Sequence, residues 1–297
     1  MLVDKKYMEW YRKELVQKLC AFIVGIVVVV TPTLYERFTV DTRPSNTLRV
    51  VFFDIGQGDA IFIQTPSGKQ VLIDGGPDAT VLRRLGKEMG FFDRTIDMVI
   101  ATHEDRDHVG GLPDVFNNYT VGTFVRTENQ GQSMEAHTID NLSKRESSEI
   151  VYARRGMTFD FGASTTLRIL FPASDPSMLE ANTSSIVAKL TYGNESFIFT
   201  GDSPQTIEKY LLSVDKNDLK ANVLKLGHHG SRTSSSREYL EAVRPEYGVV
   251  SSGKNNRYGH PHKEVVDFLH ELGINMLNTA VEGNIVFETD GKTLMRK

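Results

Sequence analysis

The alternation of apolar and polar positions divides the chain after residue 47 into short strands and helices. Runs rich in Val, Ile and Phe predict strands at 48–53, 60–65, 71–73, 97–101, 165–171, 186–192, 196–200, 221–226 and 247–251. Helical spacing predicts helices at 78–89, 204–212 and 262–272, and one that begins within 111–117. Residues 127–148 are polar and give no clear element. Strands in runs, followed by strands alternating with helices, predict an α+β domain of two mixed sheets covered by helices.

A different pattern marks the N-terminus, where residues 19–35 contain no charged side chain. This segment is at the short end of what an α-helix needs to cross a bilayer, about 17–25 residues. Basic residues precede it, which predicts a cytoplasmic N-terminus; they are Lys5, Lys6, Arg12, Lys13 and Lys18. We therefore expect a basic cytoplasmic segment at 1–18, a transmembrane signal anchor at 19–35, a linker at 36–47 and one large domain at 48–297.

Two alternatives to an anchor remain for the apolar segment. A cleaved signal peptide has the same positive flank and apolar core. The residues that follow the run, 31–36, are bulky and offer no small-x-small cleavage site, which favours the anchor. A buried core helix fits less well, because no face of the segment is polar. The anchor predicts a single-pass protein with its domain outside the cytoplasmic membrane, and cleavage would make the domain a secreted one.

Composition restricts the function only loosely. Removing residues 1–45 leaves 27 basic and 33 acidic residues, a net charge of −6, which is not the basic field typical of a nucleic-acid clamp. A local basic patch and scattered surface cations are both open readings of Lys144, Arg145, Arg154 and Arg155. The single cysteine, Cys20, excludes an internal disulfide and a thiolate zinc cluster.

The strongest chemical signal follows the apolar run 98–101. Four side chains of ligand type fall within six positions there: His103, Asp105, Asp107 and His108. Imidazole and carboxylate are ligands that divalent transition metals prefer, and the end of a strand holds them rigidly. A polar loop whose charges are only solvated is the alternative, but it does not explain this spacing.

Other ligand-type residues share this position at the end of a strand. Asp74, His103, Asp202 and His228 each stand immediately after a predicted strand. Several strand ends that meet at one rim of a sheet would bring these side chains together. The sequence therefore predicts a metal site at one edge of the two sheets.

These motifs, in this order, resemble the metallo-β-lactamase superfamily and, within it, the C-terminal hydrolase domain of the competence protein ComEC. The resemblance covers about residues 48–290. It rests on the segments 53–60, 72–76, 103–108, 200–202, 226–231 and 258–261, together with Asn182 and Ser185. It implies a four-layer αββα sandwich with the metals at one edge, here preceded by the predicted transmembrane helix.

By position, the resemblance implies two divalent metal ions. His103 and Asp105 would bind the first ion, and Asp107 and His108 the second. Asp202 would bridge the two ions, and His228 would complete the second site.

The chain departs from the superfamily's usual His-x-His-x-Asp-His motif, because Asp105 replaces the second His. Asn182 and Ser185 stand where a further His would be expected, as in the ComEC-like branch. These oxygen ligands make the first site harder and weaker, which favours Mn²⁺ or Mg²⁺ over Zn²⁺.

Other residues have expected roles around the metals. Asp107 would also orient the nucleophile, and His229, Ser231 and His260 are candidates for contacting a phosphate or protonating the leaving group. Asp74 would brace the ligand loop, cap the Gly-Gly turn that follows it, or both. The glycine-containing segment 54–59 reads as a tight turn between strands more readily than as a phosphate-binding loop.

The expected function is that of a metal-dependent hydrolase, a phosphodiesterase or nuclease that acts on DNA outside the cytoplasmic membrane. ComEC also carries an oligonucleotide-binding domain and a multi-helix channel, so a role in DNA uptake would need a separate channel protein as partner, and scavenging of DNA is the other role. Hydrolysis of a small phosphodiester, an ester or a lactone is the alternative activity. A binding domain without catalysis is a third hypothesis.

Overall fold

The computed structural model describes residues 8, 10, 12–19, 21–22, 46–90, 92–129, 134–145 and 148–297. The chain divides into two compact units, residues 1–42 with 88–93 and residues 43–87 with 94–297. Most of the predicted anchor and linker lies outside the described residues. Within the residues that are described, no helix is both long and apolar enough to cross a membrane.

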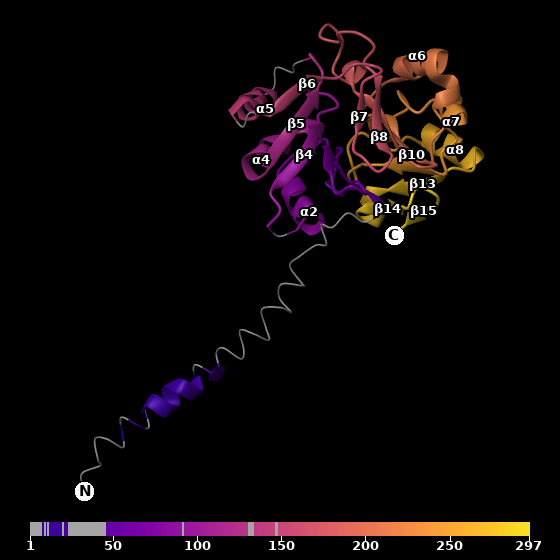
Figure 1. Ribbon diagram of the computed structural model, residues 1–297. Coiled ribbons are helices and arrows are strands. Elements are labelled where there is room, and N and C mark those ends of the chain that lie inside the picture. Colours follow the sequence, from indigo (N-terminus) through magenta and orange to yellow (C-terminus); the bar gives the residue numbers. More distant parts are fainter. Residues whose placement is uncertain are drawn as a thin grey trace. The chain divides into compact units, whose positions relative to one another are not determined.

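The second unit contains two mixed sheets, as the sequence predicted (Figure 1). The first sheet has the strand order β15-β14-β1-β2-β3-β4-β5-β6, parallel from β3 to β6 and antiparallel elsewhere. Its strands are β1 (Leu48–Phe52), β2 (Ile61–Gln64), β3 (Gln70–Ile73), β4 (Thr95–Ile100), β5 (Thr120–Arg126), β6 (Glu149–Tyr152), β14 (Ile285–Thr289) and β15 (Leu294–Arg296).

The second sheet has the order β13-β12-β11-β10-β9-β8-β7, parallel from β10 to β13 and antiparallel from β7 to β10. Its strands are β7 (Thr158–Asp160), β8 (Thr165–Phe171), β9 (Val187–Tyr192), β10 (Glu195–Phe199), β11 (Val223–Lys225), β12 (Tyr247–Val250) and β13 (Asn275–Asn278).

The main core lies between the two sheets. Alternate residues of β1, including Val50 and Phe52, belong to it, because successive side chains of a strand point to opposite faces. The Phe52 ring lies 6.2 Å from that of Phe199 in the second sheet and 6.1 Å from that of Phe287. These aromatic contacts join strands that are far apart in the sequence.

Helices cover the outer faces of the sheets. On the second sheet, α6, α7 and α8 bury Leu211, Leu240 and Leu269 against Leu224 and its neighbours. On the first sheet, Phe116 of α4 packs edge-on against Phe124 of β5 at 5.2 Å. The helices and 3₁₀ turns are α2 (Thr80–Glu88), α3 (Arg106–Val109), α4 (Leu112–Asn118), α5 (Met134–Arg145), η1 (Asn182–Ser184), α6 (Gln205–Asp215), η2 (Lys216–Asp218), η3 (Gly227–Gly230), α7 (Arg237–Val243), α8 (Lys263–Glu271) and α9 (Thr279–Glu282).

The sequence missed several elements, and they have weak patterns. The polar segment 127–148 contains α5, which was not predicted because its sequence has no clear apolar stripe. Strands β6 and β7 lie at sheet edges and are only partly buried, so their residues do not alternate clearly. β14, also missed, is the neighbour of β1 in the first sheet.

Candidate metal centre

The strand ends singled out in the sequence meet at one edge of the two sheets. β3 and β4 are parallel neighbours, and so are β10 and β11, so their carboxyl ends share an edge. Asp74 follows β3 directly, while His103, Asp202 and His228 each come three residues after the last residue of β4, β10 and β11. All of these side chains belong to the second unit.

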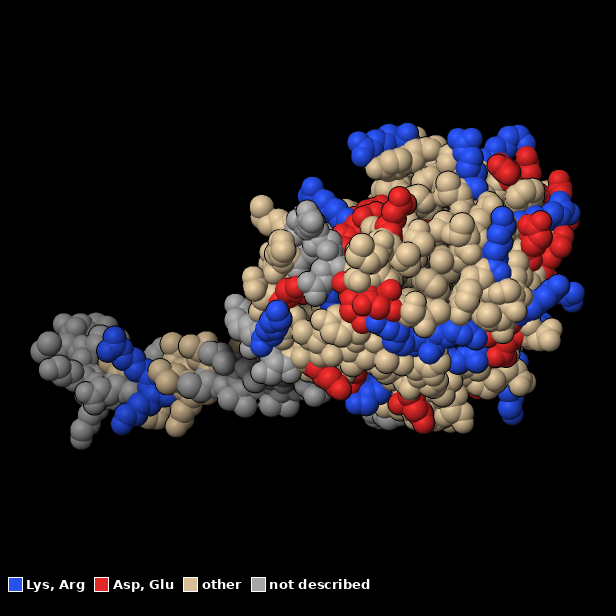
Figure 2. Space-filling model, turned by 90° about the horizontal axis from the view of Figure 1, so that it is seen from above, with Lys and Arg blue, Asp and Glu red and all other residues tan. Residues whose placement is uncertain are grey.

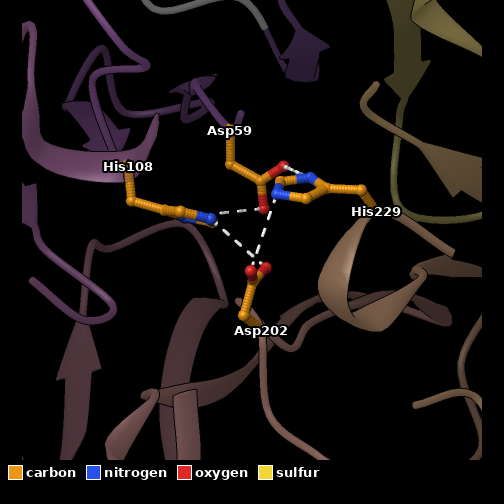
Figure 3. A group of neighbouring side chains, drawn as sticks. All are labelled: Asp59, His108, Asp202 and His229. Carbon is orange, nitrogen blue, oxygen red and sulfur yellow. Dashed lines mark ion pairs between the residues drawn. The ribbon is translucent and has the colours of Figure 1, made fainter. Parts of the chain in front are cut away.

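Asp202 lies at the centre of four imidazoles. Its carboxylate oxygens lie 3.2 Å from Nε2 of His108, 3.5 Å from Nε2 of His229, 3.7 Å from Nε2 of His228 and 3.9 Å from Nε2 of His103. Figure 3 shows Asp202, His108 and His229 pointing toward one another together with Asp59. Ligand atoms of these four residues all lie within 4.8 Å of one another.

The Nδ1 atom of each of these imidazoles has a hydrogen-bond partner. That of His108 lies 2.8 Å from Oδ2 of Asp74, and that of His229 lies 2.8 Å from the carbonyl oxygen of Ser251. The other two Nδ1 atoms lie beside threonine hydroxyls, at 3.1 Å for His103 with Thr102 and at 3.2 Å for His228 with Thr233. An imidazole that donates from Nδ1 offers its Nε2 lone pair to a metal.

Several of these atoms lack any hydrogen bond. Among the described residues, Nε2 of His103, Nε2 of His108, Oδ1 of Asp59 and Oδ1 of Asp202 are buried and without a hydrogen-bond partner. Such groups are costly unless something binds them. Ligand atoms about 2.1 Å from one shared ion lie roughly 3–4 Å apart, as these do. The residues present therefore fit a divalent metal centre of mixed nitrogen and oxygen ligands.

The three predicted aspartate ligands lie around this group. Asp107 Oδ2 is 3.2 Å from His229 Nε2, and Asp105 Oδ2 is 3.7 Å from His103 Nε2. Asp105 keeps 49% of its side chain exposed, whereas Asp202 is 3% exposed. His103 of the predicted first site and His108 of the predicted second site both approach the Asp202 carboxylate, at 3.9 Å and 3.2 Å.

His228 and His229 occupy different environments. His228 was predicted as a ligand and His229 as a substrate contact, but His229 is the closer of the two to Asp202 and is fully buried. The side chain of His228 remains 30% exposed and lines the pocket. The geometry favours His229 at the inner position, and the division of roles between them stays a prediction.

The sequence did not identify Asp59 or Lys225 as parts of the site. Asp59 ends the turn between β1 and β2, and its backbone N–H donates to the Asp107 carbonyl at 3.1 Å. Lys225, the last residue of β11, is fully buried with Nζ 2.9 Å from Asp59 Oδ2. A lysine inside the apolar run 223–226 was the available signal, because a charge there needs a buried partner.

Asp74, Ser185 and Ser231, also predicted as site residues, make hydrogen bonds within the loops around the centre. Asp74 accepts hydrogen bonds from the backbone and hydroxyl of Thr102, each at 2.8 Å. Ser185 Oγ accepts from the backbone N–H of Asp202 at 3.3 Å. Ser231 accepts from Thr233, the residue whose hydroxyl meets His228. These contacts hold the loops that carry the candidate ligands, and the roles expected for Asp74, Ser185 and Ser231 stay predictions.

Two further predicted residues have a buried polar atom that lacks a hydrogen-bond partner among the described residues. Asn182, in η1, has a buried Oδ1 with no hydrogen-bond partner in the described part of the chain. His260 has a buried Nδ1 in the same state and lines the pocket over the centre. Burial and the neighbouring charges of His229 and His228 lower the pKa of His260 to about 4. A neutral hydrogen-bonding contact with substrate therefore suits His260 better than a charged proton donor.

The centre opens to solvent through a small pocket of about 190 Å³. Five residues of the centre line it: Asp105, Asp107, Asp202, His228 and His229. Gln57, Tyr258 and His260, from other loops, complete the wall. A phosphate or carbonyl group fits such a space beside the ligands.

The surface carries charges of both signs. Lysine, arginine and acidic side chains are interspersed across the face seen in Figure 2. Of the cations considered as a basic patch, Arg154 pairs with Glu128 and Arg155 with Asp215. Two of the four cations in that group are therefore paired with carboxylates.

Protonation of the centre predicts a pH dependence for protein stripped of metal. Burial disfavours the charged form of His229, but Asp202, Asp107 and Asp59 raise its pKa to about 9. Because the pKa of His229 is higher in the folded protein, its stabilisation is fully present below the unfolded-state pKa of 6.5. The stabilisation is lost as the pH rises through the folded-state pKa of about 9. Burial likewise opposes charge on Asp107, yet hydrogen bonding and charge from His229 and His108 lower its pKa to about 2. Its contribution is present above 3.8 and is lost as the pH falls through 2.

His260 acts in the opposite direction, because its pKa is lowered to about 4 and its stabilisation is lost as the pH falls from 6.5 through 4. We therefore expect the metal-free protein to be most stable near pH 6.5, with losses toward both lower and higher pH. Urea unfolding across pH 2–9 in the presence of a chelator measures this. Metal competes with protons for Nε2, so apparent metal affinity should rise over the same alkaline range in which the metal-free protein weakens. Stability that stays level from pH 6.5 to 9 would contradict the assignment of His229.

A glycine brings the Asp59 turn against the metal loop. Gly58 has φ +127°, and a Cβ there would lie 2.0 Å from the carbonyl oxygen of Asp107. We expect Gly58→Ala to separate the two loops and to lower the free energy of unfolding by about 2 kcal/mol or more. The control is Gly56→Ala, at φ +83° with open space around the added atom, which should cost about 1 kcal/mol. Equal losses in urea unfolding would rule out close packing as the reason for Gly58.

The fold and the centre define a class of protein. Residues 53–254 match the metallo-beta-lactamase superfamily, and the chain belongs to that family.

Among its relatives, ComE operon protein 3 of Bacillus subtilis (strain 168) is 30% identical over 261 residues, covering 82% of this chain and 33% of that protein. Competence protein ComA of Neisseria gonorrhoeae is 31% identical over 245 residues, covering 82% and 33%. The predicted resemblance to ComEC-type competence proteins is confirmed, and the chain spans about a third of the length of these relatives.

A solved structure shares the fold at low identity. The crystal structure of CmlA, a diiron beta-hydroxylase from Streptomyces venezuelae, superposes with a TM-score of 0.52 at 15% identity. It covers 86% of this chain and 55% of that one. At this identity the likeness concerns the fold alone.

Proposed function

We propose that the chain is a metal-dependent phosphodiesterase that cleaves DNA. The observation that carries the proposal is the ring of four imidazole Nε2 atoms around the Asp202 carboxylate, at the base of an open pocket. Two divalent ions held about 3.5–4 Å apart would polarise a phosphoryl oxygen and supply a nucleophile from bound water at neutral pH.

The residues around Asp202 would bind two separate ions. His103 and Asp105 would hold the first ion, and Asp107 and His108 would hold the second, which His228 or His229 would complete. Asp202 lies within 4 Å of His103 and of His108 and would be shared by the two groups. Asp74 keeps His108 in the tautomer whose Nε2 is free.

Substrate contacts come from the pocket wall. Asp107 is 32% exposed and turns a carboxylate oxygen toward the pocket, where it orients the attacking water. His260 offers a neutral imidazole to the phosphate or the leaving oxygen. The carboxylates make the ligand set rich in oxygen, which suits Mn²⁺ or Mg²⁺, and the imidazoles keep Zn²⁺ as an alternative.

The relatives support DNA as the substrate. Their names mark competence, the uptake of DNA, although this chain spans only about a third of their length. The acidic charge and the 190 Å³ pocket also favour a small phosphodiester, which is the second candidate, ahead of an ester or a lactone. A role in uptake would need a separate channel protein.

We also propose that residues 19–35 anchor the chain in the cytoplasmic membrane, with the catalytic domain outside. Their uncharged sequence after a basic segment supports this. The full chain should then stay in the membrane pellet after an alkaline carbonate wash and be digested by protease added outside the cell. Recovery of the full-length chain in the soluble fraction would contradict the anchor.

The activity is tested with the full chain, Mn²⁺ and three substrates: single-stranded DNA, bis(p-nitrophenyl) phosphate and nitrocefin. Cleavage of DNA that falls about 100-fold or more in Asp107→Asn supports the proposal. The control, Asp175→Asn, changes a fully exposed carboxylate and should keep the wild-type rate.

Other results assign other functions. Turnover of the chromogenic diester alone would identify a small-molecule phosphodiesterase, and turnover of nitrocefin alone a lactam hydrolase. No turnover of any substrate, with no bound metal by elemental analysis, would contradict both enzyme hypotheses and leave a binding domain.

A further inference from the structure

The wall of the metal pocket includes an exposed aromatic residue on the loop between β12 and α8. Tyr258 lines the pocket beside Gln57 and His260, and 48% of it is exposed. An exposed tyrosine is ordinary on a protein surface, but this one stands at the opening of a buried set of metal ligands. Its position in the pocket wall indicates a role in ligand binding.

Three flat groups form one array at this opening. The rings of Tyr258 and His260 are nearly parallel, with centroids 5.6 Å apart and an angle of 20° between their planes. The guanidinium carbon of Arg257 lies 4.9 Å from the centroid of the Tyr258 ring, and its Nη2 donates to the tyrosine hydroxyl at 2.8 Å. A cation and two rings are thus held in contact before any ligand arrives.

The loop that carries the array is held by side-chain hydrogen bonds. Asn256 donates from Nδ2 to the carbonyl oxygens of Gly253 at 3.0 Å and His260 at 2.7 Å, and its Oδ1 accepts from the N–H of His260 at 2.9 Å. The Gly253 N–H donates to Gln57 Oε1 at 3.1 Å, which ties the loop to the turn that leads to Asp59. A platform fixed in this way loses little conformational freedom on binding.

We propose that Tyr258 and Arg257 form a stacking platform for a nucleobase of single-stranded nucleic acid, next to the phosphate held at the metal centre. The placement of the phosphate at the metal centre rests on the proposed function. Bases stack on tyrosine rings and on guanidinium planes whatever their sequence, and the guanidinium also attracts the backbone. Bases of a duplex are already stacked on each other, so the platform selects single strands.

Binding tests the platform without any turnover. The chain has one tryptophan, Trp10, so the full-length double variant Trp10→Phe/Tyr258→Trp carries a single tryptophan in the platform. We expect an oligothymidine to quench its fluorescence and to bind about tenfold or more tightly than an abasic oligomer of equal length and charge. Equal affinities, or no quenching on binding, would overturn the platform.

Turnover provides a second measurement with matched substrates. The p-nitrophenyl ester of thymidine 5′-phosphate and methyl p-nitrophenyl phosphate share a leaving group and differ by the nucleoside. We expect Tyr258→Leu to reduce the ratio of their kcat/KM values about tenfold or more, whereas Tyr258→Phe retains it. The control, Tyr152→Leu, removes an exposed tyrosine of β6 and should leave the ratio unchanged.

The two measurements separate the hypotheses. If the wild-type chain hydrolyses neither the two esters nor single-stranded DNA, the phosphodiesterase proposal fails, and the oligothymidine comparison still decides the platform. If both esters are hydrolysed and the ratio is the same in wild type and Tyr258→Leu, the platform is wrong while the phosphodiesterase stands.

Discussion

Asp202→Asn is expected to lower metal affinity about 100-fold or more and to abolish measurable phosphodiester hydrolysis, with the fold kept. The asparagine has nearly the same size but lacks the negative charge that four imidazoles surround. His229 at 3.5 Å and His108 at 3.2 Å hold the pKa of Asp202 well below its usual range, and both would lose this anionic partner. Elemental analysis of the purified chain and its hydrolysis rate measure the two effects.

Asp175→Asn serves as the matched control for this substitution as well, because its exposed carboxylate accepts hydrogen bonds from Ser177 of its own turn and lies outside the candidate centre. Circular dichroism establishes whether both variants are folded. Wild-type metal content in a folded Asp202→Asn protein would show that the metal is bound elsewhere.

Lys225→Met is expected to lower the free energy of unfolding of the metal-free protein by about 3–5 kcal/mol. The lysine ammonium is fully buried and pairs with Asp59, whose side chain is 3% exposed, at 2.9 Å. Methionine fills a similar space without charge, so the buried Asp59 carboxylate would lose its closest cation and keep only His229 at 3.4 Å and His108 at 3.9 Å. Urea unfolding in the presence of a chelator measures the loss without a metal ion taking the place of the ammonium.

Two further variants isolate the charge effect. Lys69→Met removes a lysine that is 55% exposed and pairs with Asp97 at the surface, and it should cost about 1 kcal/mol or less. Lys225→Met/Asp59→Asn removes both buried charges and should regain part of the stability. A double variant that is no more stable than Lys225→Met alone would show that packing rather than charge pairing explains the lysine.

The positions of the candidate ligand residues near strand ends could be predicted from the sequence, while their roles stay predictions. An apolar run that stops at a residue of ligand type appears four times, at Asp74, His103, Asp202 and His228, and parallel pairing brings these ends to one edge. The helices α2, α6 and α8 were also predicted close to their bounds, because each has an apolar stripe facing a sheet.

Other parts of the site depend on contacts that a linear pattern does not contain. Asp59 reaches the centre through the packing of Gly58 against Asp107, which joins segments far apart in the chain. The inner position of His229 follows from left-handed backbone at two successive residues, with φ 48° at His228 and 55° at His229. Such a conformation is uncommon for residues other than glycine and is not indicated by the motif Gly-His-His-Gly.

If this edge of the sheets is a metal-dependent phosphodiesterase centre, hydrolysis of bis(p-nitrophenyl) phosphate should depend on added metal. The decisive measurement is the rate of this hydrolysis by chelator-stripped full-length protein as Mn²⁺ is added back. We expect no turnover in the stripped protein and a saturable recovery with Mn²⁺ that Asp202→Asn does not show. Full turnover in the stripped protein would contradict a metal-dependent centre. Absence of hydrolysis of both this diester and single-stranded DNA at any concentration of Mn²⁺, Mg²⁺ or Zn²⁺ would contradict a phosphodiesterase.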